Sequence, residues 1–230
     1  LGFLAILALF LAVAPAFRSF EAFATILYAS STLGIVALAV GMLMIGGEFD
    51  LSSGVAVTTA ALAATMLNYN LHLNSWVGAF LALGISLAIG ALNGFLVTRT
   101  GIDSFLITLA AFLMLQGLNL AVTKLVTGQV ATPTIADMEG FPSAHAVFAG
   151  EFHIGNVRIS VTVLWWIFFV AMASFVLFRT KFGGWITAVG GNADAARAVG
   201  VPVRRVKILL FMGIGFAAWF VGMHTLFAFD

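Results

Sequence analysis

Apolar residues fill seven long stretches of the chain, and most polar residues lie in the connections between them. A helix needs about 20 mostly apolar residues to cross the ~30 Å hydrocarbon core of a bilayer, and it satisfies its own backbone hydrogen bonds there. The pattern therefore predicts seven spans, the first shortened by the chain start and ended by Pro15. Their predicted bounds are Leu1–Ala14, Ala22–Ile45, Leu51–Leu67, Ser75–Val97, Ile102–Val126, Ser160–Phe178 and Ile208–Phe229.

The composition strengthens this interpretation. Hydrophobic residues make up 62% of the chain, charged residues only 8%, and the mean hydropathy is +1.14, whereas soluble domains carry about 25% charged residues. We therefore predict an all-α, polytopic transmembrane bundle, with residues 1–230 forming a single transmembrane domain. A net charge of +1 without a long basic run gives no reason to expect a nucleic-acid partner. The lack of cysteine excludes disulfides and thiolate ligands, and no histidine stands at metal-ligand spacing, so we expect no metal site.

Lysine and arginine are distributed unevenly between the predicted connections, and short cytoplasmic loops carry an excess of these residues. If the connection 179–207 is cytoplasmic, seven of the ten basic residues lie on that side. This orientation places residues 127–159 outside as an extracytoplasmic loop, where Pro133 and Pro142 prevent a long helix. A loop of this length predicts a short element of its own, with either a binding role or a passive one.

Two carboxylates, Glu48 and Asp50, interrupt the apolar pattern between the second and third predicted spans. An ionised carboxylate at a helix centre costs about 2.5–3.5 kcal/mol on insertion scales, so both groups are expected to face protein, water or the interface. Glycines on either side allow the chain to leave the helical conformation. The stretch therefore predicts one broken helix near residues 46–54.

The two carboxylates have different expected roles. Asp50 or Ser52 either caps a new helix beginning near Leu51 or lines a solute path, because Asp and Ser are preferred N-cap residues. For Glu48, a position lining a wet cavity is expected, because charged groups at membrane depth usually mark a pathway.

Further polar residues lie deep in the later spans. Gln116 and Asn119 are three residues apart and so share a helix face, and Asn93 lies in the inner half of the fourth span. Each either bonds to a neighbouring helix or contributes to a solute path. Glycines within the spans are expected to allow close helix packing, namely Gly34, Gly41, Gly84, Gly90, Gly213 and Gly215. The candidates for a translocation path are Glu48, Asp50, Ser52, Ser53, Asn93, Gln116 and Asn119.

The cytoplasmic connection contains the stretch "TAVGGNADAARAVGVPVRRVKI", Thr187 to Ile208. Asn192 is a good N-cap, the alanines that follow favour a helix, and Gly200 closes it as the C′ residue. The stretch therefore predicts a helix of about two turns, too short to cross lipid. A rigid element with basic flanks at this surface suits contact with a soluble partner, although an interfacial loop with one helical turn is the alternative.

This stretch resembles the coupling loop of the permease subunits of ABC importers, and in particular that of the ribose-type sugar permeases. Two more stretches are similar to that family in the same order, "VGMLMIGGEFDLSSG" (Val40–Gly54) and "NGFLVTRTGIDSFLITLAAFLMLQGL" (Asn93–Leu118). The chain departs from the family pattern at Glu48-Phe49, where many members have a small or aliphatic pair. The family pattern also implies about ten spans, so three further helices are expected after Asp230, and the chain is interpreted as a truncated copy.

The resemblance implies a subunit of a bacterial inner-membrane importer that is not itself an enzyme. Its expected partners are a second copy of the permease, a cytoplasmic ABC ATPase and an extracytoplasmic solute-binding protein. No phosphate-binding loop of the G-x-x-x-x-G-K-[ST] type occurs in the sequence. We therefore expect no cofactor in this chain, with ATP and magnesium on the partner ATPase. The residues implied to contact that ATPase are Gly190, Gly191, Asn192, Asp194, Ala195, Ala196, Arg197 and Gly200.

Three other functions remain open from the sequence. A branched-chain amino-acid permease resembles the chain in the same loop, and half-helix ends near residues 46–53 would receive a charged solute. An intramembrane serine protease would need Ser53 and His224 as nucleophile and base. An ATP-independent channel would give no reason for the short cytoplasmic helix.

Overall fold

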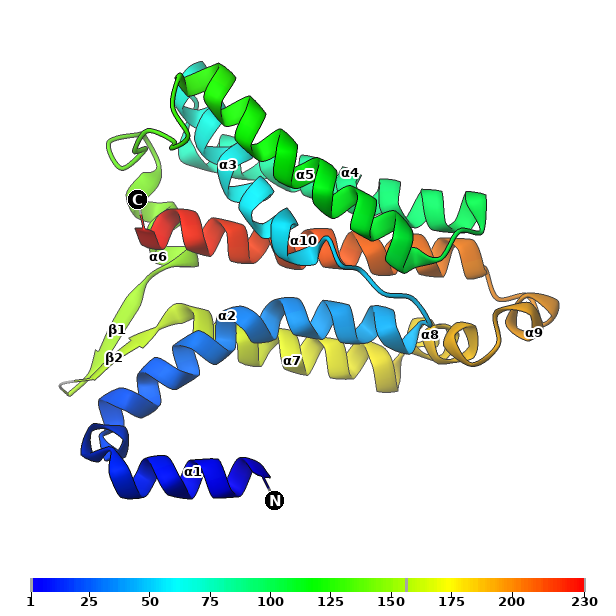
Figure 1. Ribbon diagram of the computed structural model, residues 1–230, viewed down its shortest axis with the longest axis horizontal. Helices are drawn as coiled ribbons and strands as arrows, with labels where there is room; N and C mark the ends of the chain where they lie inside the picture. Colours follow the sequence, from blue (N-terminus) through cyan, green and yellow to red (C-terminus); the bar gives the residue numbers. More distant parts are fainter. Residues whose placement is uncertain (1, 156, 230) are drawn as a thin grey trace.

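The computed structural model describes residues 2–155 and 157–229 and is almost entirely helical (Figure 1). In chain order its elements are α1 (Gly2–Val13), the 3-10 helix η1 (Pro15–Arg18), α2 (Phe20–Ile45), α3 (Ser53–Leu71), α4 (Ser75–Thr100), α5 (Ser104–Thr127), α6 (Phe141–Phe148), β1 (Glu151–Ile154), β2 (Val157–Ser160), α7 (Val161–Arg179), α8 (Lys181–Gly191), α9 (Ala193–Ala198) and α10 (Val203–Phe229). The predicted all-α architecture is confirmed, since the two strands form only a small antiparallel hairpin.

All seven segments predicted to span the membrane contain a helix. Five of these helices, α2, α4, α5, α7 and α10, are long and apolar enough to cross a bilayer. The other two differ from the prediction. Helix α1 has 12 residues and, at about 1.5 Å per residue, reaches only about 18 Å, while α3 has 19 residues but a more polar sequence.

The long helices lie along the long axis of the molecule and change direction at two ends (Figure 1). One end holds α8, α9, the turn between α4 and α5, and the C-terminal end of α2. Seven of the ten basic residues lie there, namely Arg99, Arg179, Lys181, Arg197, Arg204, Arg205 and Lys207. We call it the cytoplasmic end, because the charge bias favours that orientation. The opposite, outer end carries α6, the hairpin, and Arg18, Lys124 and Arg158.

Helix α10 is the central element of the bundle. In its most apolar 18-residue window, 67% of the residues are buried, against 11% in α5. It packs on α3 and α4 on one side and on α2 on the other, and α7 covers α2 (Figure 1). The hydrophobic core therefore surrounds α10, whereas α5 and α7 present large apolar side chains at the surface of the chain.

Close contact between α4 and α10 depends on glycines. A Cβ atom at Gly90 would lie 2.4 Å from the carbonyl oxygen of Phe211, and one at Gly215 would lie 2.3 Å from that of Ser86. Gly34 is also tightly packed, because Trp166 covers it. In contrast, a Cβ at Gly41, Gly84 or Gly213 would meet nothing within 4 Å among the described residues, so a packing role for these glycines stays a prediction.

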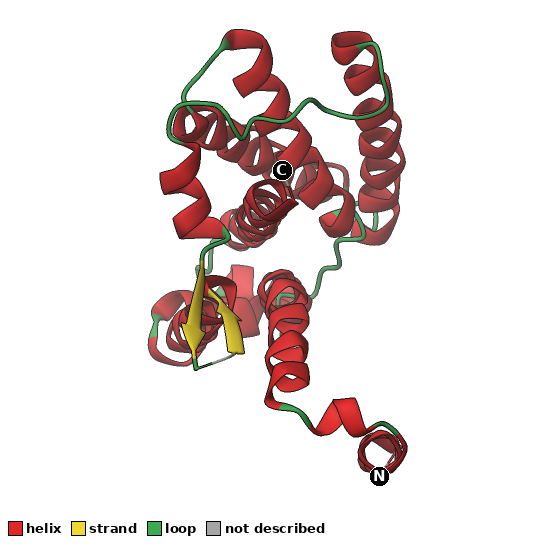
Figure 2. Ribbon diagram, turned by 90° about the vertical axis from the view of Figure 1, so that its left-hand side faces the viewer, coloured by secondary structure: helices red, strands yellow, loops and turns green. Residues whose placement is uncertain are grey.

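The outer connection contains the short element predicted for it, as α6 and the hairpin β1–β2. Figure 2 views this end and shows the hairpin beside the helices. Helix α6 is docked on α10 through Phe148, which is 3% exposed and contacts Trp219, Phe220 and Phe227. Residues 127–159 are thus partly folded against the bundle, and their binding role stays a prediction.

Candidate functional site

The predicted break in helical structure is present between α2 and α3. Helix α2 ends at Ile45, and Gly47 adopts a φ of +82°, in the left-handed region that favours glycine. The chain then runs back into the bundle without helical structure and enters α3 at Ser53 (Figure 1). Because α2 and α3 run in opposite directions, the break lies at a reversal of the chain rather than between two collinear half-helices.

The first turns of α5 hold the non-helical segment. The backbone N–H of Phe49 donates to Ser104 Oγ at 3.0 Å, and the N–H of Leu51 donates to Thr108 Oγ1 at 3.1 Å. Both hydroxyls are buried, and the bonds satisfy backbone N–H groups that have no helix partner. Two hydroxyl side chains four residues apart on one helix face therefore replace the hydrogen bonds lost where the helix breaks.

Asp50, Ser52 and Asn93 form a buried group that we call the Asp50 cluster. Asp50 Oδ1 accepts from the Ser52 N–H at 2.7 Å and from Ser52 Oγ at 2.6 Å, and Asn93 Nδ2 donates to Ser52 Oγ at 3.1 Å. The three residues are 1–3% exposed. The cluster thus joins the non-helical segment to α4, about two turns before the C-terminal end of that helix.

The capping prediction for this segment is borne out only in part, because Asp50 accepts an N–H at the entry to α3 but the Ser52 side chain does not cap the helix. Helix α3 begins at Ser53 rather than near Leu51, and the side chain of the N-cap residue Ser52 makes no capping bond. The reason is that Asp50 lies two residues earlier and engages both the N–H and the hydroxyl of Ser52. Asp50 therefore fixes the turn that precedes the helix.

Glu48 lies at the cytoplasmic end, where its Oε1 accepts from Lys207 Nζ at the start of α10. The Glu48 side chain is 10% exposed and the Lys207 side chain 19%. The ion pair joins residues 159 positions apart and gives the carboxylate a partner of opposite charge. That Glu48 lines a wet cavity stays a prediction.

The remaining path candidates are separated from one another. Ser53 Oγ donates to the backbone oxygen of Asp50 at 3.3 Å and so adjoins the Asp50 cluster. Gln116 is exposed and Asn119 is half-buried on α5, more than two helical turns beyond Thr108. The structure therefore brings Ser53 to the Asp50 cluster but does not bring the α5 pair there.

Sequence analysis missed a second polar group, between α2, α3 and α10. A cavity of about 540 Å³ is lined there by apolar residues and by Tyr28, Thr32, Ser53, His224 and Thr225. His224 Nδ1 lies 2.8 Å from the carbonyl oxygen of Phe148, which can only accept, so Nδ1 carries the proton and Nε2 accepts from the Tyr28 hydroxyl at 2.9 Å. The sequence pointed to Ser53 and His224, but nothing in it paired either residue with Tyr28.

This geometry opposes the protease alternative. Ser53 and His224 line the same cavity, but both ring nitrogens of His224 are engaged, by Phe148 and Thr162 on one side and by Tyr28 on the other. The Ser53 hydroxyl donates to Asp50 instead. A nucleophile and base need a direct hydrogen bond or one water between them, and this arrangement is a structural network.

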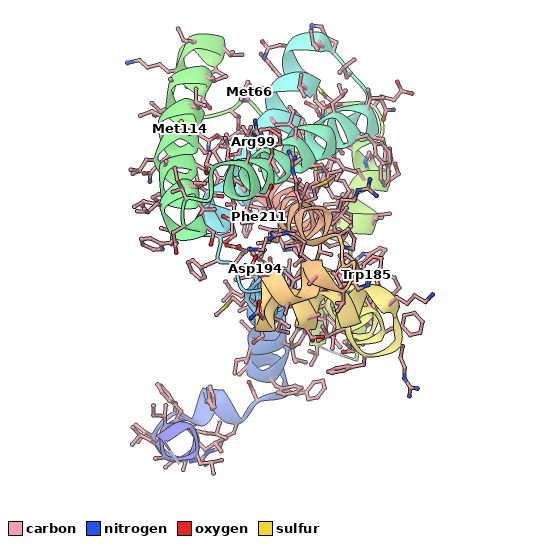
Figure 3. The ribbon with its side chains drawn as sticks, turned by 90° about the vertical axis from the view of Figure 1, so that its right-hand side faces the viewer. Met66, Arg99, Met114, Trp185, Asp194 and Phe211 are labelled. Carbon is pink, nitrogen blue, oxygen red and sulfur yellow. The ribbon has the colours of Figure 1, made fainter. Side chains whose placement is uncertain are left out.

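The short helix predicted in the cytoplasmic connection is confirmed as α9. Asn192 Oδ1 accepts from the N–H groups of Asp194 and Ala195 at 3.0 and 2.9 Å, and Gly200 follows the helix with a φ of +86°. Ala196 is 4% exposed and packs on the core, whereas Asp194, Ala195 and Arg197 face outward. Figure 3 looks onto this end and shows Asp194 there with Trp185 of α8. Helix α8 itself was not predicted.

A helical membrane chain with a polar interruption inside the bundle and a small exposed helix on its basic face has the features of a membrane permease component. Residues 22–230 match the family model described as the branched-chain amino acid transport system / permease component. The chain belongs to this family and is a multi-pass protein of the inner membrane.

Curated relatives give further detail. The ribose import permease protein RbsC of Escherichia coli (strain K12) is 28% identical over 97% of this chain and 66% of its own length. The galactose/methyl galactoside import permease protein MglC of Haemophilus influenzae is 29% identical over 96% and 67%, and the autoinducer 2 import system permease protein LsrC of Enterobacter sp. (strain 638) is 33% identical over 96% and 62%. The chain thus spans about two thirds or less of the length of these relatives. No solved structure matches it.

Proposed function

We propose that the chain is the permease component of an ATP-binding-cassette importer that moves a simple sugar across the membrane by alternating access. The observation that carries the proposal is the similarity to import permeases for ribose and galactose over nearly the whole chain. The fold agrees with this function, because it has a polar interruption inside the bundle and a small helix exposed on the cytoplasmic face.

In this proposal α9 is the docking element for a cytoplasmic ATPase. Its buried residue, Ala196, anchors the helix to the core, while Asp194, Ala195 and Arg197 present an exposed face. ATP and magnesium bind to the ATPase. Closure of two ATPase subunits then draws the α9 helices of two permease copies together, and the attached spans tilt so that the path opens to one side and then to the other.

A sugar is compatible with the polar groups of the bundle. A sugar offers neutral hydroxyls, and the Asp50 cluster consists of hydroxyl, amide and carboxylate groups already bonded to one another. Glu48 is already paired with Lys207, and Asp50 bonds to the neutral groups of Ser52, so the preference for a sugar over an amino acid rests on the relatives. An external binding protein is expected to supply most of the discrimination between sugars.

Uptake into membrane vesicles tests the substrate class directly. Vesicles that contain the intact permease with its ATPase and binding protein are expected to accumulate labelled pentose when ATP is hydrolysed, and not labelled leucine. Vesicles without the permease are the control. Accumulation of leucine alone would favour the branched-chain amino-acid alternative, and pentose entry without ATP hydrolysis would favour a channel.

Replacing Ala195 with tryptophan tests the docking role of α9. The side chain is exposed, so the change is expected to leave the free energy of unfolding within about 0.5 kcal/mol. ATP-dependent uptake is expected to fall by about tenfold or more, since bulk at the centre of an interface disrupts contacts worth about 2 kcal/mol or more. Ala195→Ser is the matched control and should transport normally. Full activity of Ala195→Trp would contradict docking at this face.

A further inference from the structure

The turn formed by residues 46–50 contacts the cytoplasmic segment at two separate places. The first is a backbone contact with the end of α8. A Cβ atom at Gly190 would lie 1.8 Å from the carbonyl oxygen of Ile45, so the two backbones touch with no side chain between them. A Cβ at Gly47 would in turn lie 3.3 Å from the Cα of Gly190. The end of α8 therefore cannot shift toward α2 without displacing this turn.

The second contact is the ion pair between Glu48 and Lys207. Both side chains are largely shielded from water, so the attraction between them is screened less than in an exposed pair. Breaking a shielded pair by removing one partner also leaves the other charge uncompensated. The start of α10 is therefore held to the same turn as the end of α8.

The other cations on the first turns of α10 have different surroundings. The guanidinium of Arg204 lies 5.1 Å from the ring centroid of Phe95 on α4, and Arg205 is exposed. Lys207 is thus the residue of this group that contacts the turn. In the chain, α9 lies between Gly190 and Lys207. The segments before and after the docking helix therefore both contact the turn formed by residues 46–50.

That turn continues directly into the Asp50 cluster. Glu48 is two residues before Asp50, and the intervening Phe49 is held by Ser104 of α5. The connection between the two is a short, hydrogen-bonded segment without helical structure. The segment leads to the carboxylate that fixes the entry to α3.

We propose that Glu48, Lys207 and Gly190 are positioning residues that transmit movement of the α9 docking helix to the Asp50 cluster. The inference rests on the proposed function, because it requires a partner that moves α9. The proposal gives Glu48 a role at the cytoplasmic end. Its carboxylate couples the segment that contains the docking helix α9 to the non-helical segment that leads to the Asp50 cluster.

The test measures solute transported per ATP hydrolysed by the intact permease, reconstituted in liposomes with its ATPase and binding protein. Glu48→Gln and Lys207→Met are each expected to retain ATP hydrolysis while transport per ATP falls by about fivefold or more, as expected for loss of coupling between two sites. The charge-swapped variant Glu48→Lys with Lys207→Glu is expected to recover most of the wild-type ratio. Arg99→Met, which removes an exposed cation at the same end but outside the docking segment, is the control and should not change it.

Three results would overturn the inference. The first is that transport per ATP is unchanged in both single variants. The second is that hydrolysis, transport and thermal stability all fall together, as expected for a contact that only stabilises the fold. The third is that transport per ATP is no higher in the charge-swapped variant than in the single variants. If the single variants do not fold, the charge-swapped variant alone decides. Failure of the proposed function is recognised separately, because wild-type liposomes would then show no ATP-dependent pentose uptake.

Discussion

Replacing Asp50 with alanine is expected to reduce ATP-dependent uptake by about tenfold or more. The change leaves the N–H and hydroxyl of Ser52 without their acceptor in a site that is almost fully buried. An unsatisfied buried group costs about 1–3 kcal/mol in the conformation described here, and about 1.4 kcal/mol shifts the balance between two conformations of a transport cycle by a factor of ten. Since Asn93 bonds to the same hydroxyl, the link between the non-helical segment and α4 also weakens.

Two further variants separate this effect from a loss of charge. Asp50→Asn keeps an oxygen that accepts from Ser52, so it is expected to lose less activity than Asp50→Ala. Asp137→Ala removes an exposed carboxylate from the outer connection and should transport normally. Uptake is measured at equal amounts of folded protein. Wild-type uptake by Asp50→Ala would exclude the Asp50 cluster from any part in transport.

Gly90→Ala is expected to destabilise the bundle markedly through a single methyl group. The added Cβ would lie 2.4 Å from the carbonyl oxygen of Phe211, closer than real Cβ atoms approach, so α4 and α10 would have to separate. Overpacking of this kind costs about 1–3 kcal/mol. For a chain of this size, that lowers the melting temperature in detergent by roughly 2–12 °C.

Gly84→Ala is the matched control for this experiment, because it adds the same methyl group to the same helix. A Cβ at Gly84 meets nothing within 4 Å, and alanine favours a helix over glycine by about 1 kcal/mol. Gly84→Ala should therefore be at least as stable as the wild type. Equal melting temperatures for the two variants would show that the contact between α4 and α10 tolerates a wider spacing.

Local chemistry explains what could be predicted from the sequence. The apolar pattern located seven helices, and the Asn192 cap with the glycine at position 200 located α9, because each signal lies within a few neighbouring residues. The interruption near residues 46–54 was also predicted, since glycine and carboxylates disfavour a continuous apolar helix. Helix α8 was missed because two glycine pairs in its sequence weaken its helix propensity, and packing against the core compensates.

Contacts between distant residues could not be predicted in the same way. Lys207 and Glu48 are 159 positions apart, and Tyr28 and His224 are 196 apart, so no local pattern pairs them. The packing role of a glycine is likewise not visible in the local sequence. Gly84 and Gly90 lie six residues apart on one apolar helix, and only the position of α10 distinguishes the glycine that must stay small from the one that has room.

The central position of α10 has a consequence for how freely this sequence can vary. Side chains on the exposed faces of α5 meet no other helix among the described residues, so one apolar group can replace another there without a compensating change in this part of the chain. Almost every face of α10 meets another helix, so an exchange there requires a compensating change in α2, α3, α4 or α6. Evolutionary drift should therefore be fast along α5 and slow along α10, although the two helices are almost equally apolar.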